Sequence, residues 1–150
     1  MFLRHVAQTS DAPLLVEVEK AEGVYLYGPD GKQYLDLIAG ISVSNLGHCH
    51  PDVVAAVQKQ AAEYMHLMVY GEYAVTPQAR YAELLTSQLH EDLNNVYFVN
   101  SGAEATEGAM KLAKRVTGRS EFCYFKNSYH GSSQGALSIM GDEYFKEAYR

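Results

Sequence analysis

Apolar positions recur at helical spacing in one clear stretch of the chain, residues 102–117. Its apolar face is formed by Ala105, Ala109, Leu112, Ala113 and Val116. Acidic residues lie near its start and basic residues near its end, which suits the direction of the helix dipole. Ser101 is a good N-cap residue and Gly118 a good C-terminal stop, so the pattern predicts a helix between them. Within this helix, Glu107 is expected to pair with Lys111.

Short β-prone runs flank this helix, at residues 96–99 and 121–126. Strands that alternate with helices indicate the α/β class. The segment Asn100-Ser101-Gly102-Ala103 then joins a strand to a helix N-terminus, where the first N–H groups lack intrahelical partners and attract anions. Gly102 lets the backbone approach an oxygen closely. An ordinary strand–helix connection with a serine cap and no ligand is the alternative.

The first third of the chain alternates β-prone runs with turn signals. We expect short strands at residues 14–19, 24–27 and 33–38, with turns at 20–23 and 28–31. This spacing predicts a small antiparallel meander.

Two further helices are predicted, one beginning at Pro51 and one capped by Thr76. The segment His48-Cys49-His50 before Pro51 contains zinc-ligand residue types. Alternating residues of an extended segment point to opposite sides, however, and no second pair is spaced to complete the ligand set. A turn leading into the helix is the better interpretation.

A second polar loop, residues 127–133, follows the strand predicted at 121–126. Ligands of α/β sheets collect beyond the carboxyl ends of the strands, so we expect this loop near the first one. Tyr129 offers a ring that can stack on a heterocycle, and His130 can hydrogen-bond or pack beside it. The alternative is that both residues simply pack on the edge of the sheet.

Three segments in collinear order resemble the class III pyridoxal-phosphate aminotransferases. They are Gly47-His-Cys-His-Pro51, Asn100-Ser-Gly-Ala-Glu-Ala105, and Tyr129-His-Gly131 with Gly135-Ala-Leu-Ser138. The resemblance covers nearly the whole chain and implies the α/β architecture of fold type I. It also implies that residues 1–50 form a meander of the small domain and that residues 51–150 begin the cofactor-binding large domain. Family members are homodimers with active sites at the dimer interface.

The resemblance assigns cofactor roles to residues of both loops. It implies that the backbone N–H groups of Gly102 and Ala103, with Ser101 adjacent, hold the phosphate of pyridoxal 5'-phosphate (PLP). It further implies that Tyr129 stacks on the pyridine ring, with His130 beside it. These roles agree with the chemistry that the two loops indicate by themselves.

The resemblance supports the substrate roles less consistently than the cofactor roles. Ile41 and Tyr70 occupy positions where family members often line the substrate pocket. In several members an arginine follows the aromatic-His-Gly segment and binds a substrate carboxylate, whereas this chain has Ser132. This departure argues against an acetylornithine or ornithine specificity and leaves diaminopelargonate-like, ω-amino-acid and semialdehyde-aminomutase-like substrates open.

Transamination also needs a lysine that forms a Schiff base with PLP and a carboxylate on the pyridine nitrogen. In the family both lie beyond the position equivalent to Arg150, and Lys111, Lys114 and Lys126 do not match that lysine in context. We therefore expect the chain to be the N-terminal portion of a longer enzyme and to lack transaminase activity by itself. Its catalytic residues are expected elsewhere.

Composition narrows the remaining possibilities. The 150 residues are 47% hydrophobic and 20% charged, as in globular proteins, and the net charge of −6 argues against nucleic-acid binding. No run is long and apolar enough for a membrane span, and two isolated cysteines favour a reducing cytoplasm. The sequence thus predicts a PLP-dependent aminotransferase that moves an amino group from an amine or ω-amino acid to a 2-oxo acid. A non-catalytic module that binds a phosphometabolite, or has a structural role, is the alternative.

Overall fold

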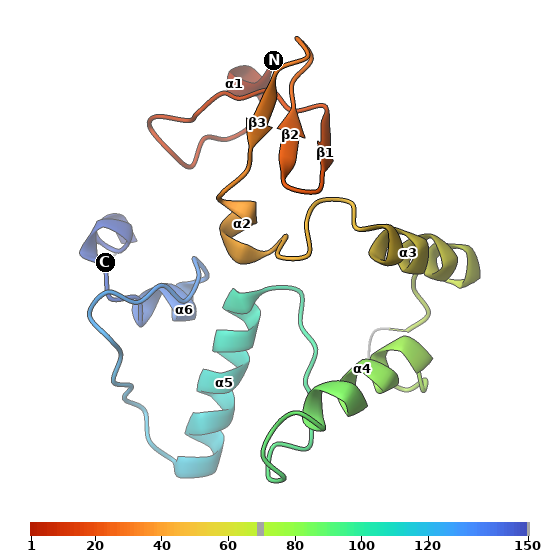
Figure 1. Ribbon diagram of the computed structural model, residues 1–150. Coiled ribbons are helices and arrows are strands. Elements are labelled where there is room, and N and C mark those ends of the chain that lie inside the picture. Colours follow the sequence, from red (N-terminus) through yellow and green to blue (C-terminus); the bar gives the residue numbers. More distant parts are fainter. Residues whose placement is uncertain (69–70, 150) are drawn as a thin grey trace. The chain divides into compact units, whose positions relative to one another are not determined.

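The computed structural model describes residues 1–68 and 71–149, which fall into two compact units, Met1–Tyr73 and Ala74–Arg150 (Figure 1). Tyr70, a predicted substrate residue, lies outside the described residues. The division predicted at residues 50 and 51 concerns the domains of the complete enzyme and stays a prediction.

The first unit contains a three-stranded antiparallel sheet in the order β1-β2-β3. Its strands are β1 (Lys20–Glu22), β2 (Tyr25–Tyr27) and β3 (Gln33–Leu35). The predicted meander is therefore confirmed, as is the turn at residues 28–31, where Gly31 has a φ of 77° and its N–H donates to the Gly28 carbonyl at 3.1 Å.

The first predicted strand, at residues 14–19, is wrong. The strand that pairs with β2 is Lys20–Glu22, within the segment expected to turn, and the tight turn follows at Gly23 with a φ of 57°. Leu15 has a φ of 53°, which interrupts the extended backbone that a strand requires. The apolar residues that alternate in this run therefore do not mark a paired strand.

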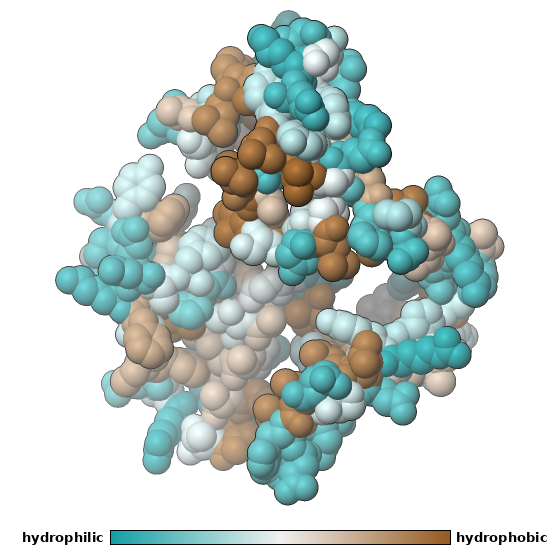
Figure 2. Space-filling view, viewed as in Figure 1, coloured by the Kyte–Doolittle hydropathy of each residue, from teal (hydrophilic) through white to brown (hydrophobic). Residues whose placement is uncertain are grey.

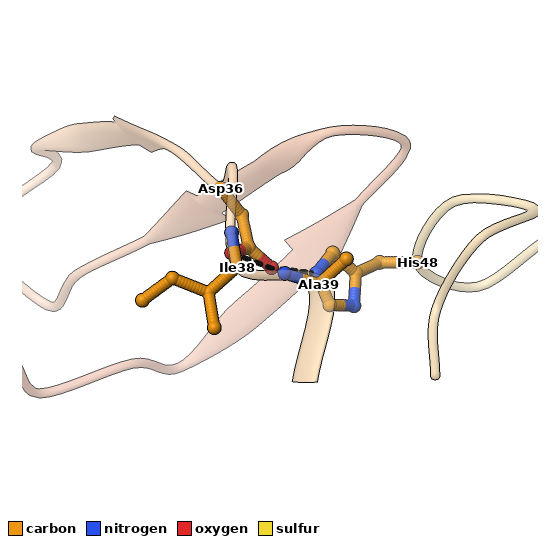
Figure 3. A network of polar contacts seen from close by, with 4 residues as sticks. All are labelled: Asp36, Ile38, Ala39 and His48. Atoms are coloured by element: carbon orange, nitrogen blue, oxygen red, sulfur yellow. Dashed lines mark hydrogen bonds and ion pairs between the residues drawn. The ribbon is translucent and has the colours of Figure 1, made fainter. Parts of the chain in front are cut away.

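A left-handed turn follows the sheet at α2 (Ala39–Ser42). All its residues have positive φ, including Ile41 at 61°, although a left-handed conformation costs about 1–2 kcal/mol for each residue with a Cβ. Asp36 stabilises the start of this turn (Figure 3). Its Oδ1 accepts the N–H groups of Ile38 and Ala39, both at 2.9 Å, and its Oδ2 accepts the His48 Nε2–H at 2.7 Å.

The contact with Asp36 gives His48 a structural role. His48 also exchanges backbone hydrogen bonds with Gly23, at 2.7 and 3.0 Å, so the segment before α3 is attached to the sheet turn. The helix predicted from Pro51 is confirmed as α3 (Pro51–Glu63). Within residues 1–68 and 71–149, no group of three or more His, Cys, Asp or Glu side chains is arranged to hold a metal ion.

The remaining elements are helical. The first unit begins with α1 (Phe2–His5), and the second contains α4 (Thr76–Thr86), α5 (Gly102–Thr117), α6 (Gln134–Ser138) and the 3₁₀ turns η1 (Glu143–Phe145) and η2 (Glu147–Tyr149). The helix predicted at Thr76 is confirmed, although Val75 is its N-cap. The strands predicted at 96–99 and 121–126 are not formed, because neither run is paired with a neighbour among the described residues.

The most buried apolar side chains lie in and after α6. Ala136 and Met140 are fully buried, and Leu137 is nearly so. Many other apolar side chains are exposed, and Figure 2 shows them gathered over β3 and α2 of the first unit. In the part of the chain that the structure describes, no helix has both the length and the apolar character needed to cross a membrane.

The Asp36 contacts predict an acid-sensitive turn. The pKa of Asp36 lies below its ordinary value, chiefly because the Ala39 N–H donates to the ionised carboxylate and secondarily because His48 does. Asp36→Asn should therefore lower the midpoint of urea unfolding at neutral pH. The difference from wild type should be complete above the ordinary aspartate pKa of about 3.9 and shrink as the pH falls through the lowered value.

Asp11 supplies the matched control, because it is exposed and no partner for its carboxylate is described in the structure. Asp11→Asn should leave the midpoint unchanged. Equal midpoints for Asp36→Asn and wild type at neutral pH would contradict a stabilising role for this carboxylate.

Candidate functional site

The N-terminus of α5 is capped by residues next to it in the sequence. Ser101 has an extended backbone, and its Oγ accepts the Glu104 N–H at 3.2 Å. The Glu104 carboxylate in turn accepts the Asn100 N–H at 2.7 Å, so cap and first turn hold each other. At the other end, Gly118 is left-handed with a φ of 69°. The helix and both of its predicted ends are confirmed.

This arrangement leaves donors free at the start of the helix. Among the contacts of the described residues, the N–H groups of Gly102 and Ala103 have no acceptor. A Cβ built on Gly102 would meet nothing within 4 Å, so the backbone is open on that side. Unpaired N–H groups and the positive end of the helix dipole together attract an anion.

The loop at residues 129–133 lies directly against this turn. Gly131 is buried and has a φ of 119°, and a Cβ built on it would lie 2.6 Å from the Ala103 Cβ. Only glycine allows both this backbone conformation and this approach. The expected proximity of the two loops is thus confirmed.

A pocket of about 590 Å³ lies between the two loops. It is lined by Ser101, Gly102, Ala103, Thr106, Tyr129, His130, Gly131, Ser132 and Ser133. The structure thus brings the five predicted cofactor residues together with Ser132, a predicted substrate residue. Ile41, the other described substrate candidate, belongs to the first unit, where its side chain is 87% exposed.

The Tyr129 ring at this pocket is exposed to solvent and contacts Ser132 and Phe145. The Tyr129 side chain is 65% exposed, and its Oη lies 3.3 Å from Ser132 Oγ. Phe145 contacts the same ring edge-on, with ring centroids 6.0 Å apart. The backbone carbonyl of His130 accepts a long hydrogen bond, 3.4 Å, from Thr106 Oγ1 on α5. A flat ligand could therefore stack on Tyr129 while its anionic group faces α5.

Glu107 is a site-shaping residue that the sequence did not reveal. Instead of a close ion pair with Lys111, its Oε1 accepts Ser133 Oγ–H at 2.7 Å, Gly135 N–H at 2.8 Å and Ala136 N–H at 3.1 Å. The Ser133 hydroxyl is the largest cause that holds the pKa of Glu107 below its ordinary value, and the Lys111 charge adds a smaller effect. No local pattern signals these contacts, because the partners lie 26 to 29 residues away.

No lysine or arginine among the described residues lines this pocket. Lys111 and Lys114 border a separate pocket along the side of α5. Lys146 is buried, and its Nζ lies 3.4 Å from both Tyr124 Oη and the Glu143 carboxylate. The pocket of about 590 Å³ therefore offers an anion site and an aromatic face, and no lysine lines it.

The N-terminus of α5 and the aromatic loop border one pocket in a chain that combines helices with a small sheet. Comparison with known proteins makes the class specific: the family model for class III aminotransferases matches residues 6–149. The chain belongs to the class III aminotransferase family.

Relatives in sequence include acetylornithine aminotransferases. That of Archaeoglobus fulgidus is 39% identical over 146 residues, covering 97% of this chain and 38% of the relative. That of Methanopyrus kandleri is 42% identical over 136 residues, covering 89% of this chain and 34% of the relative. The chain thus spans little more than a third of the length of these relatives.

Solved structures give the same picture. The taurine:2-oxoglutarate aminotransferase of Bifidobacterium kashiwanohense, in complex with PLP and glutamate, matches with a TM-score of 0.85 and 33% identity, covering 98% of this chain and 33% of that one. An adenosylmethionine-8-amino-7-oxononanoate aminotransferase of Methanocaldococcus jannaschii matches with a TM-score of 0.89 and 27% identity, covering 99% and 36%. The chain has the fold of part of a PLP transaminase of fold type I.

The contact between the loops predicts opposite effects of alanine at two nearby glycines. Gly131→Ala should lower the free energy of unfolding by about 1–3 kcal/mol, because its Cβ would overlap Ala103 and the backbone has positive φ. Gly102→Ala should leave it unchanged or slightly raised, since its Cβ meets open space. Urea unfolding followed by circular dichroism measures both. Equal losses in the two variants would contradict the observed packing.

Proposed function

We propose that the protein binds PLP in the pocket between α5 and the loop at residues 129–133. As part of a class III aminotransferase, it would transfer an amino group from an amine or ω-amino acid donor to a 2-oxo acid. The observation that carries the proposal is the pair of unpaired N–H groups, at Gly102 and Ala103, that faces a pocket bordered by the Tyr129 ring. Family membership supports the enzymatic function over the non-catalytic alternative.

The residues present fit this cofactor. Its phosphate needs several donors, and three residues that line the pocket, Ser101, Gly102 and Ala103, supply a hydroxyl and two N–H groups that have no acceptor among the described contacts. Its ring needs a flat apolar surface, which Tyr129 supplies from the opposite loop. A volume of about 590 Å³ is in the range of small-molecule sites.

The proposed roles of the chain are binding and orientation. The N-terminus of α5 fixes the phosphate, and Tyr129 fixes the plane of the ring, with His130 beside it. When bound, PLP supplies the electron sink on which transamination depends. The Schiff-base lysine and the carboxylate for the pyridine nitrogen belong, in this proposal, to parts of the enzyme other than the residues described.

The proposal for the substrate rests on Ser132, which stands where several family members have a carboxylate-binding arginine. A serine hydroxyl cannot bind a carboxylate in the bidentate manner of arginine. We therefore do not transfer the acetylornithine specificity of the sequence relatives to this protein. Ile41 and Tyr70 are proposed to line the substrate pocket, and a cytoplasmic homodimer is the proposed assembly.

Replacing Gly102 by proline tests the phosphate site. Proline suits the first position of a helix, and the extended backbone of Ser101 is compatible with a following proline, so Gly102→Pro removes one N–H while keeping α5. Losing one hydrogen bond to a charged group should weaken PLP binding roughly tenfold to hundredfold. Equilibrium dialysis with PLP, on this chain and on any longer product of the same reading frame, measures it.

Gly102→Ala is the matched control, because it keeps the N–H and adds a Cβ in open space. Its Cβ takes up space beside the proposed phosphate position, so it should bind PLP no better than wild type but more tightly than Gly102→Pro. Unchanged affinity in Gly102→Pro, with α5 intact by circular dichroism, would remove this donor from the proposed site. Absence of PLP binding by the wild-type chain and by the longer product would overturn the proposed function.

Stacking on Tyr129 predicts a second pair of results. Tyr129→Phe loses the contact with Ser132 Oγ but keeps the ring, so PLP affinity should change little. Tyr129→Ala removes the ring and should weaken binding several-fold, given that an aromatic contact contributes roughly 0.5–1.5 kcal/mol beyond area burial. The same dialysis measures both variants. Equal affinities for the alanine and phenylalanine variants would exclude ring stacking at this position.

A further inference from the structure

Glu107 joins α5 to the loop that closes the pocket. Its half-buried carboxylate accepts hydrogen bonds from one side chain and two backbone groups at the start of α6, and all of them converge on Oε1. Ser133, the N-cap residue of α6, makes no capping bond with its own side chain. Glu107 therefore performs from a distance the capping that a local residue usually supplies.

The loop at residues 129–133 is fixed at two points, and both involve glycine. At one point Gly131 lies against Ala103, and at the other a Cβ built on Gly135 would overlap the Glu107 carboxylate. Just beyond the loop, Ala136 and Leu137 are buried in α6. A further contact lies just before Gly131, where Thr106 Oγ1–H donates a long hydrogen bond of 3.4 Å to the His130 carbonyl.

From this arrangement we infer that Glu107 is a positioning residue of the anion site. It acts through Ser133, Gly135 and Ala136 to hold Tyr129 and Gly131 over the first turn of α5. The consequence for PLP rests on the proposed function, whereas the consequence for the loop does not. Glu107 itself does not line the pocket, so its effect on binding is indirect.

The geometry predicts which substitutions are tolerated. Because the donors converge on one oxygen, Glu107→Gln can keep all three contacts through its amide oxygen. Glu107→Ala removes every one of them. Gly135→Ala disturbs the same contact from the side of the loop. A role that needed the negative charge itself would instead make the glutamine variant as defective as the alanine variant.

Hydrogen–deuterium exchange with mass spectrometry tests the loop without any ligand. Peptides covering residues 127–138 should exchange faster in Glu107→Ala and Gly135→Ala than in wild type, while peptides of α4 stay unchanged. Glu107→Gln should resemble wild type. Glu83→Gln is the matched control, because Glu83 is an exposed helical glutamate for whose side chain the structure describes no partner.

PLP dialysis on the same variants tests the positioning role. Affinity should fall roughly tenfold to hundredfold in Glu107→Ala, as when a residue that orients a binding group is lost, and be rescued in Glu107→Gln. Unchanged exchange in Glu107→Ala would overturn the anchoring. Faster exchange with unchanged PLP affinity would overturn the link to the site. If wild type bound no PLP, the proposed function would fail while the exchange data still decided whether Glu107 holds the loop.

Discussion

The packing of one loop on the first turns of α5 is the constraint on which the candidate site depends. A helix N-terminus alone offers donors, but it offers them to water on every side. The approach of Gly131 to Ala103 places a polar loop and an aromatic ring opposite those donors. This approach requires a residue without a Cβ on the loop, and it requires the loop to be fixed to α5 further along, at Glu107.

The same physical device occurs in both units of the chain. Asp36 and Glu107 are each carboxylates that accept two backbone N–H groups and one side-chain donor. In each case these donors favour the ionised form and hold the pKa below its ordinary value. Protonation under acid therefore weakens the anchor of both irregular segments, whereas the helices depend mainly on backbone hydrogen bonds that do not titrate.

Local signals made part of this structure predictable. Ser101, Gly118 and Pro51 act on their own backbone or its next few residues, so the ends of their helices could be predicted from sequence. The proximity of the two loops was also predicted, but the strands on which that prediction relied are not formed among the described residues, and the loops meet through Gly131 and Ala103 instead.

The features that were missed depend on distant partners. The role of Glu107 is set by groups 26 to 29 residues away. The local spacing instead predicted that Glu107 pairs with Lys111. The strand expected at residues 14–19 failed for the same reason. Its alternation satisfies a local rule, but pairing is decided by the register of β2, which selects Lys20–Glu22. The roles assigned to Tyr129 and His130 stay predictions, since position alone does not establish a ligand contact.

The unpaired runs at residues 96–99 and 121–126 show that strands and the candidate site depend on different contacts. The strands depend on neighbouring strands, whereas the site depends on local packing. A strand is stabilised by its neighbours, and parallel pairing requires a crossover from elsewhere in the chain. The relatives are roughly two and a half times as long as this chain, which spans little more than a third of them. The anion site needs only contacts within residues 100–136, between α5 and the adjoining loop. In the proposed function, cofactor binding and transamination are therefore separable, because the first would depend on this local packing and the second also on groups outside these residues.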